Sequence, residues 1–262
     1  MAIKKQRFFA SGYAVDVFAD RQLKSDRTPV VVVLPGFPDV PGPSALTPLL
    51  TDLGIRVLQP HLAGTYDSPG VFSLAGAADT LSAVSQALSA GIWTAPDGEV
   101  VNLGWAPTKL GLVGHSFGGI FALRCFPALA GLDLVILTSA AIHYAPSFGC
   151  HEVGPEHYGS VGLSHPRTYR LAPMDEWAEV LSGVDPAPSK PIGHVPSVRI
   201  LYGEKDKYFD VRAAVERAPA LVAAYTGCND IQTTTVIGGG HPLAELLPNV
   251  DMRGALRPLF KD

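Results

Sequence analysis

Short apolar runs that alternate with segments of helical periodicity constrain the fold of this chain most strongly. Residues 30–34 read Val-Val-Val-Val-Leu, and a run without a polar face is typical of a strand buried on both sides of a parallel sheet. Strands are predicted at 30–34, 55–58, 110–114, 134–137, 198–202 and 231–237. Helices are predicted at 43–53, 72–90, 116–130, 208–225 and from 242 onward. This alternation predicts an α/β fold with a doubly wound, mostly parallel sheet.

The N-terminal segment follows a different pattern. Residues 8–19 alternate around Ser11 and Gly12, which predicts a β-hairpin and brings the sheet to about eight strands. A Pro-Asp-Gly turn at 96–98 leaves open a further small hairpin that would include residues 100–101.

The alternation breaks between residues 140 and 196. This stretch is rich in Gly, Pro, His and aromatic residues, and only one helix is predicted in it, at 173–182. Because the stretch offers no hydrophobic core of its own, it is predicted to be a small cap, or lid, inserted after the sixth strand. Residues 1–139 and 197–262 then form the core, and 262 residues suit one α/β domain with an insertion.

Composition excludes several classes of protein. Hydrophobic residues make up 47% and charged residues 17% of the chain, which excludes a disordered protein. The net charge is −4 and no basic run is longer than Lys4-Lys5, so we expect no nucleic-acid partner. No stretch approaches about 18 uninterrupted apolar residues, so we expect no membrane span. The oligomeric state is not indicated.

The cysteines and the N-terminal residues bear on the compartment. An odd number of cysteines (Cys125, Cys150 and Cys228) does not suit a disulfide framework and favours a reducing compartment. The charged residues at the N-terminus are not followed by the apolar stretch of a signal peptide. We therefore expect a cytoplasmic location.

Residues 114–119, Gly-His-Ser-Phe-Gly-Gly, carry the clearest chemical signal. They follow a predicted strand and open a predicted helix, which is the context in which G-x-S-x-G indicates a nucleophile. A serine on such a sharp turn takes a strained backbone conformation, and its close neighbours must lack a Cβ atom. Ser116 is therefore the predicted nucleophile, and His115 is expected to point away from the reacting centre.

A serine hydroxyl needs a base, and the base needs an acid that orients it. Asp206 follows the predicted strand 198–202 at the end where parallel strands deliver site residues, so it is the predicted acid, with Glu204 and Asp210 as alternatives. His241 follows three glycines after the last strand and is the predicted base.

An acyl-transfer site also needs two backbone N–H groups for the oxyanion. Phe117, directly after the nucleophile, is expected to supply one. Phe37 is expected to supply the other, because Gly36 permits close approach and Pro38 has no N–H.

These motifs together resemble the α/β-hydrolase superfamily over nearly the whole chain. The matching segments are the oxyanion loop at 34–38, the nucleophile turn at 114–119, the acid turn at 203–206 and Gly240-His241. Pro35 stands where many members have histidine, and this version of the loop resembles that of cutinase-type polyester and lipid hydrolases, which lack a substantial cap. The resemblance implies ester, thioester, amide, epoxide, haloalkane or C–C substrates and no cofactor. Ser116 argues against epoxide and haloalkane substrates, which normally require an aspartate nucleophile.

The predicted cap offers a candidate substrate pocket. Its aromatic residues suggest an apolar pocket for an acyl or aromatic group. The residues expected to bind substrate are His143, Tyr144, Phe148 and Trp177. A metal site is not expected, since one polar cluster matches no zinc pattern: Cys150, His151, Glu152, Glu156 and His157.

The sequence thus predicts a serine hydrolase that cleaves a carboxylic ester of a small-to-medium apolar substrate through an acyl-enzyme on Ser116. Two alternatives stay open. One is an acyltransferase or a cofactor-free perhydrolase or haloperoxidase with the same triad. The other is a non-catalytic ligand-binding protein on the same scaffold.

Overall fold

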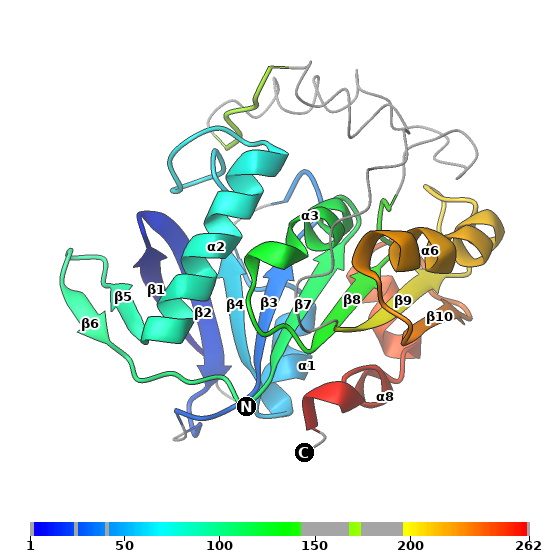
Figure 1. Cartoon of the computed structure of the whole chain (residues 1–262). Helices are drawn as coiled ribbons and strands as arrows, with labels where there is room; N and C mark the ends of the chain where they lie inside the picture. Colours follow the sequence, from blue (N-terminus) through cyan, green and yellow to red (C-terminus); the bar gives the residue numbers. More distant parts are fainter. Residues whose placement is uncertain (1–2, 24–25, 40–41, 143–167, 174–195, 261–262) are drawn as a thin grey trace.

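The computed structural model describes residues 3–23, 26–39, 42–142, 168–173 and 196–260, and six parallel strands form one side of its sheet (Figure 1). They are β3 (Val30–Leu34), β4 (Arg56–Pro60), β7 (Leu110–His115), β8 (Leu134–Thr138), β9 (Ser197–Gly203) and β10 (Ile231–Val236). Every residue of β3 and β8 is buried, as their apolar sequences require. The predicted α/β fold class is confirmed.

Four antiparallel strands extend this sheet on the side of β4. They are β1 (Ile3–Ala10), β2 (Tyr13–Asp20), β5 (Ile92–Thr94) and β6 (Val100–Asn102), and the full order is β10-β9-β8-β7-β3-β4-β2-β1-β5-β6. The sheet therefore has ten strands rather than about eight. The two additional strands have three residues each, and β5 joins β1 only through Thr94 and Phe9, which is too little for a periodic pattern.

Helices cover both faces of the sheet, and each face has its own apolar core (Figure 1). On one face lie α2 (Leu74–Ala90), α3 (Gly118–Cys125) and α6 (Val211–Thr226). On the other lie α1 (Leu46–Asp52), α7 (Leu243–Leu246) and α8 (Met252–Ala255). Short 3₁₀ turns follow at η1 (Phe126–Ala128), η3 (Leu247–Asn249) and η4 (Arg257–Phe260).

The helix ends follow from local sequence. The Ser73 hydroxyl accepts a hydrogen bond from the Gly76 N–H at the start of α2, and Gly91 ends that helix in the left-handed conformation (φ 69°). Asp210 and Gly227 have the same roles for α6. Helix α3 is shorter than the predicted 116–130, because Pro127 has no N–H to continue it.

Most of the predicted cap, 143–167 and 174–195, lies outside the described residues, so the proposed boundaries of the cap remain a prediction. The described part, 168–173, runs along the loop that precedes α2. The Tyr66 N–H donates to the Thr168 carbonyl (2.8 Å), and the Phe72 N–H donates to the Arg170 carbonyl (2.7 Å). This short segment is therefore bonded to the core.

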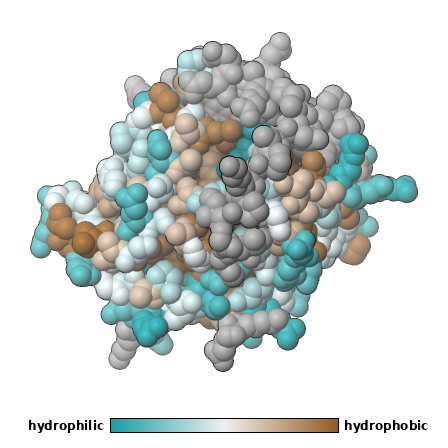
Figure 2. Space-filling model, in the orientation of Figure 1, coloured by the Kyte–Doolittle hydropathy of each residue, from teal (hydrophilic) through white to brown (hydrophobic). Residues whose placement is uncertain are grey.

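The surface and the helix lengths bear on possible contacts with other molecules. Apolar side chains are exposed on the β5–β6 hairpin, at Ile92 and Val100, and brown residues mark this edge of Figure 2. Among the described residues, no helix has the length and apolar character needed to cross a membrane.

Candidate active site

The structure brings three predicted side chains together at the carboxyl ends of three parallel strands. Ser116 follows β7, Asp206 follows β9 and His241 follows β10. His241 Nε2 lies 2.9 Å from Ser116 Oγ, and His241 Nδ1 lies 2.8 Å from Asp206 Oδ2. A carboxylate only accepts hydrogen bonds, so the Nδ1 atom carries the proton and Nε2 is left to accept from the serine hydroxyl.

Crowding around the backbone fixes the conformation of Ser116. Its φ is 51°, in the left-handed region that a serine rarely adopts. A Cβ atom on Gly118 would lie 2.3 Å from the carbonyl oxygens of Leu34 and Pro35, and one on Gly114 would lie 2.6 Å from the Cβ of Ala122. Only glycine fits at these positions, which is the steric requirement predicted from the motif.

Asp206, and neither of its two alternatives, contacts His241. Its side chain is fully buried, and its Oδ1 atom also accepts from the Tyr208 N–H at 2.9 Å. Glu204 instead accepts from the Gly238 N–H at 2.9 Å, and Asp210 caps α6. The geometry therefore selects Asp206 as the partner of the imidazole.

Aromatic rings surround the His241 imidazole. The rings of Tyr208 and Phe209 lie 4.6 and 5.6 Å from it, centroid to centroid. The sequence did not predict either residue as part of the site. Their position shortly after the acid turn was the signal that could have indicated them.

The imidazole of His115 also lies beside that of His241, at 5.4 Å between centroids. The expectation that it points away from the site is wrong. Its Nδ1 atom is 3.1 Å from the Thr138 carbonyl oxygen. Burial, together with the nearby His241, lowers the pKa of His115 to about 4, so His115 is neutral at pH 7.

The loop after β3 runs next to the serine. A Cβ atom on Gly36 would lie 3.2 Å from the Cβ of Ser116, so this glycine permits the close approach that was predicted. The Phe37 ring packs against the ring of Phe117 (5.5 Å between centroids) and stacks on that of Phe72 (5.6 Å). Both residues predicted as oxyanion donors thus belong to one aromatic cluster beside Ser116.

A small cavity of about 30 Å³ lies behind this loop. Its lining is mostly apolar and consists of Pro35, Gly36, Pro60, Leu62, Thr65, Tyr66, Phe72, Phe117, Phe121 and Tyr169. Figure 2 shows apolar residues gathered on the upper part of the molecule, next to the residues drawn in grey.

Several predicted site residues lie outside the described part of the chain. These are the four expected substrate-binding residues (His143, Tyr144, Phe148 and Trp177) and the polar cluster between Cys150 and His157. Within the described ranges, no group of three or more His, Cys, Asp or Glu side chains could hold a metal ion.

Comparisons with known proteins support the same fold. No protein-family model and no curated protein matches the sequence. Among solved structures, Est1E from Butyrivibrio proteoclasticus matches with a TM-score of 0.57 and 14% identity, over 98% of this chain and 99% of that one. The 2-hydroxy-6-oxo-6-phenylhexa-2,4-dienoate hydrolase of Rhodococcus sp. strain RHA1 matches with a TM-score of 0.59 and 16% identity, over 99% of both chains.

A third match names the fold. Mouse alpha/beta hydrolase domain-containing protein 10 covers 100% of both chains, with a TM-score of 0.57 and 14% identity. The chain therefore has the α/β-hydrolase fold, as the sequence motifs predicted.

Proposed function

We propose that the protein is a serine hydrolase that cleaves a carboxylic ester, or a related acyl bond, of a small-to-medium apolar substrate. The observation that carries this proposal is the continuous contact from Asp206 through His241 to the Ser116 hydroxyl, at 2.8 and 2.9 Å. Solved structures of the same fold include an esterase from Pyrococcus furiosus, which supports the choice of an ester.

The proposed reaction is acyl transfer in two halves. His241 Nε2 takes the proton of Ser116 as its Oγ bonds to the substrate carbonyl carbon, and Asp206 stabilises the resulting imidazolium. The negative charge that develops on the carbonyl oxygen is held by the N–H groups of Phe37 and Phe117. The imidazolium then protonates the leaving alcohol as the ester C–O bond breaks. Water repeats these steps on the acyl-enzyme, which releases the acid and restores the serine.

The substrate class rests on the surroundings of the serine. The aromatic cluster that contains Phe37 and Phe117 favours an apolar acyl group over a charged one. We propose that His143, Tyr144, Phe148 and Trp177 complete the pocket from the cap. The reaction requires no metal or other cofactor.

The cysteines bear on location. Cys125 and Cys228 are free and buried thiols, which supports a protein that works in a reducing compartment, and we propose the cytoplasm.

Fluorophosphonate labelling followed by assays with p-nitrophenyl esters of increasing acyl length tests the proposed function. We expect labelling of wild type and turnover that is fastest with short to medium acyl chains. Ser116→Ala should abolish both and retain the circular dichroism spectrum of wild type. Ser89→Ala, an exposed serine on α2, is the matched control and should behave as wild type.

Three results would redirect the proposal. An absence of Ser116-dependent labelling would favour a ligand-binding protein. Labelling followed by faster transfer to an added alcohol or to peroxide than to water would favour an acyltransferase or a perhydrolase. Turnover that survives Ser116→Ala would remove the proposal altogether.

A further inference from the structure

Two tyrosine hydroxyls bond to one residue of the loop that carries Phe37. The Tyr66 hydroxyl donates to the carbonyl oxygen of Asp39, and the Asp39 N–H donates to the Tyr169 hydroxyl at 2.7 Å. The two hydroxyls also lie 3.2 Å from each other. Three groups therefore form a closed ring of hydrogen bonds, and both main-chain polar groups of Asp39 take part in it.

The tyrosines come from different parts of the chain, 103 residues apart. Tyr66 lies in the loop between β4 and α2, and Tyr169 lies in the described part of the predicted cap. Burial raises the pKa of both phenols, so both are protonated at neutral pH.

The same residues also restrain the Phe37 side chain. The Tyr169 ring meets the Phe37 ring edge-on at 4.6 Å between centroids. The loop is thus held at Phe37 by rings and at Asp39 by hydroxyls, two residues apart. Pro35 and Gly36 of this loop also line the cavity of about 30 Å³, together with Tyr66 and Tyr169.

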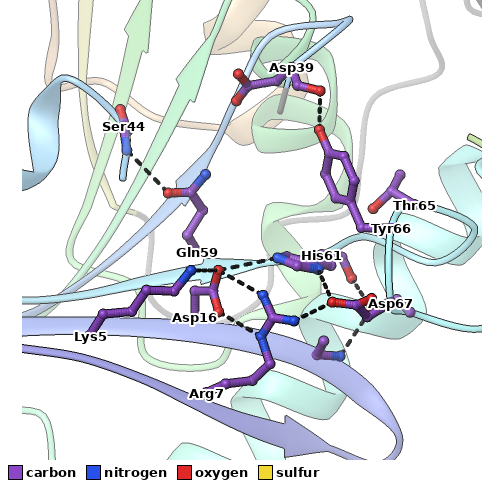
Figure 3. A network of polar contacts seen from close by, with 12 residues as sticks. Lys5, Arg7, Asp16, Asp39, Ser44, Gln59, His61, Thr65, Tyr66 and Asp67 are labelled. Carbon is purple, nitrogen blue, oxygen red and sulfur yellow. Dashed lines mark hydrogen bonds and ion pairs between the residues drawn. The ribbon is translucent and has the colours of Figure 1, made fainter. Parts of the chain in front are cut away.

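His61, which contacts Asp16, packs against Tyr66 from below in the view of Figure 3. The Tyr66 ring packs edge-on against the His61 imidazole at 5.1 Å, and His61 lies within 3.4 Å of the buried carboxylate of Asp16. Tyr66 itself has a φ of 44°, which a tyrosine adopts only where its surroundings require it.

The geometry points to Tyr66 and Tyr169 as positioning residues for the oxyanion donor at Phe37. This inference rests on the proposed function, since it concerns the N–H group that would hold the oxyanion. Neither tyrosine is assigned a contact with the reacting atoms. Their effect is to fix the loop so that the Phe37 N–H does not have to be reoriented as charge develops.

Tyr66→Phe and Tyr169→Phe test this inference, because each removes one hydroxyl and retains the ring. With p-nitrophenyl acetate, we expect each to lower kcat by about 10-fold per titrated active site, with KM changed by less than about 2-fold. Inhibition by a trifluoromethyl ketone, whose adduct on Ser116 carries an oxyanion, should weaken by about the same factor. The pH profile should not move, since the contacts of His241 are unchanged.

The double variant sharpens the test. Both hydroxyls belong to one ring of bonds around Asp39, so the losses should not multiply, and the double variant should lose about 10- to 30-fold rather than 100-fold. Tyr225→Phe is the matched control. It removes a hydroxyl from a buried tyrosine at the opposite end of α6 from the site, and it should keep the kcat of wild type.

Two outcomes would overturn the inference. One is that both single variants keep kcat per titrated site within 2-fold of wild type. The other is that they lose only thermal stability or the fraction of active protein, as a merely structural role would require. Failure of the proposed function is distinguishable, because wild type itself would then not react with fluorophosphonate.

Discussion

The two sides of the candidate site are built by different means. On the side of β7, β9 and β10, backbone crowding at Gly114 and Gly118 fixes the turn at Ser116, and hydrogen bonds join His241 and Asp206 to it. On the side of β3 and β4, side chains hold the loop that contains Phe37, through rings, hydroxyls and the ion pairs around Asp16. The first side tolerates no added atom at its glycines, whereas the second depends on contacts between residues far apart in the sequence. Substitutions should therefore break the first side abruptly and the second by degrees.

Apart from Ser116→Ala, Asp206→Asn should have the largest effect. The amide preserves the shape of the side chain but favours the wrong tautomer of His241, so we expect kcat to fall by about 10⁴-fold with little change in KM. Steady-state kinetics and active-site titration measure this loss. A decrease of less than 10-fold would mean that His241 does not depend on Asp206.

Gly118→Ala should be nearly as damaging, through folding rather than chemistry. The new methyl group would lie 2.3 Å from two carbonyl oxygens, so the start of α3 must move away from the loop after β3. We expect a loss of about 3 kcal/mol or more in the free energy of unfolding, measured by urea denaturation. Gly42→Ala is the control, because there is open space around its Cβ position. Unchanged stability of Gly118→Ala would show that this crowding does not fix the turn.

Asp16→Asn tests the ion pairs on the other side of the site. Burial alone would raise the pKa of Asp16, but hydrogen bonds from His61, Arg7 and Lys5 outweigh it and lower the pKa far below 3.8. Removing the charge should cost about 3 kcal/mol in the free energy of unfolding at pH 7. Because the pKa of Asp16 is lower in the folded than in the unfolded state, its charge stabilises the folded state at pH values above the unfolded pKa. This stabilisation is lost as the pH falls towards the folded pKa, so the difference between variant and wild type should shrink below about pH 4. A difference that persists undiminished at pH 2 would contradict this account.

His115→Asn should change how stability depends on pH. Because the folded pKa of His115 is about 4 against 6.5 in the unfolded chain, the unfolded state binds its proton first as the pH falls. The contribution of His115 to the free energy of unfolding is therefore complete above pH 6.5, and it decreases by about 2 kcal/mol between pH 7 and pH 5. The variant should lose less stability over this interval than wild type, by thermal unfolding in the two buffers. Equal losses in both proteins would contradict the direction given for the His115 pKa.

Glu204→Gln should have the smallest effect and is the counterpart of Asp206→Asn. Glu204 accepts a hydrogen bond from the Gly238 N–H at an exposed position, and a glutamine oxygen can still accept it. We expect kcat within 3-fold of wild type and a stability change below about 0.5 kcal/mol. A loss comparable to that of Asp206→Asn would reverse the assignment of the acid.

The side of the candidate site on β7, β9 and β10 was the part that the sequence could predict. The strand Val30–Leu34 and the turn at 114–119 can each be recognised from a few consecutive residues. The order of the catalytic residues along the chain in this fold then predicts an acid and a histidine after the serine. The end of α3 could also have been predicted, because Pro127 lacks an N–H. The apolar periodicity continues past this proline, and the predicted helix was therefore too long.

The side held by side chains could not be predicted in this way. Tyr66 and Tyr169 lie in segments without periodicity, 103 residues apart, and only the fold brings their hydroxyls to Asp39. The position of His115 depends on a hydrogen bond to Thr138 across two strands. No local pattern of residue types records such contacts.

The bonding of residues 168–173 to the loop before α2 has a practical consequence for engineering. Arg170 alone donates to the carbonyl groups of Tyr66, Ser68 and Gly70. A chimera that replaced the whole of 140–196 with the corresponding segment of another protein of this fold would therefore lose these hydrogen bonds. Exchange points placed on either side of residues 168–173 would keep the native hydrogen bonds between this segment and the loop before α2.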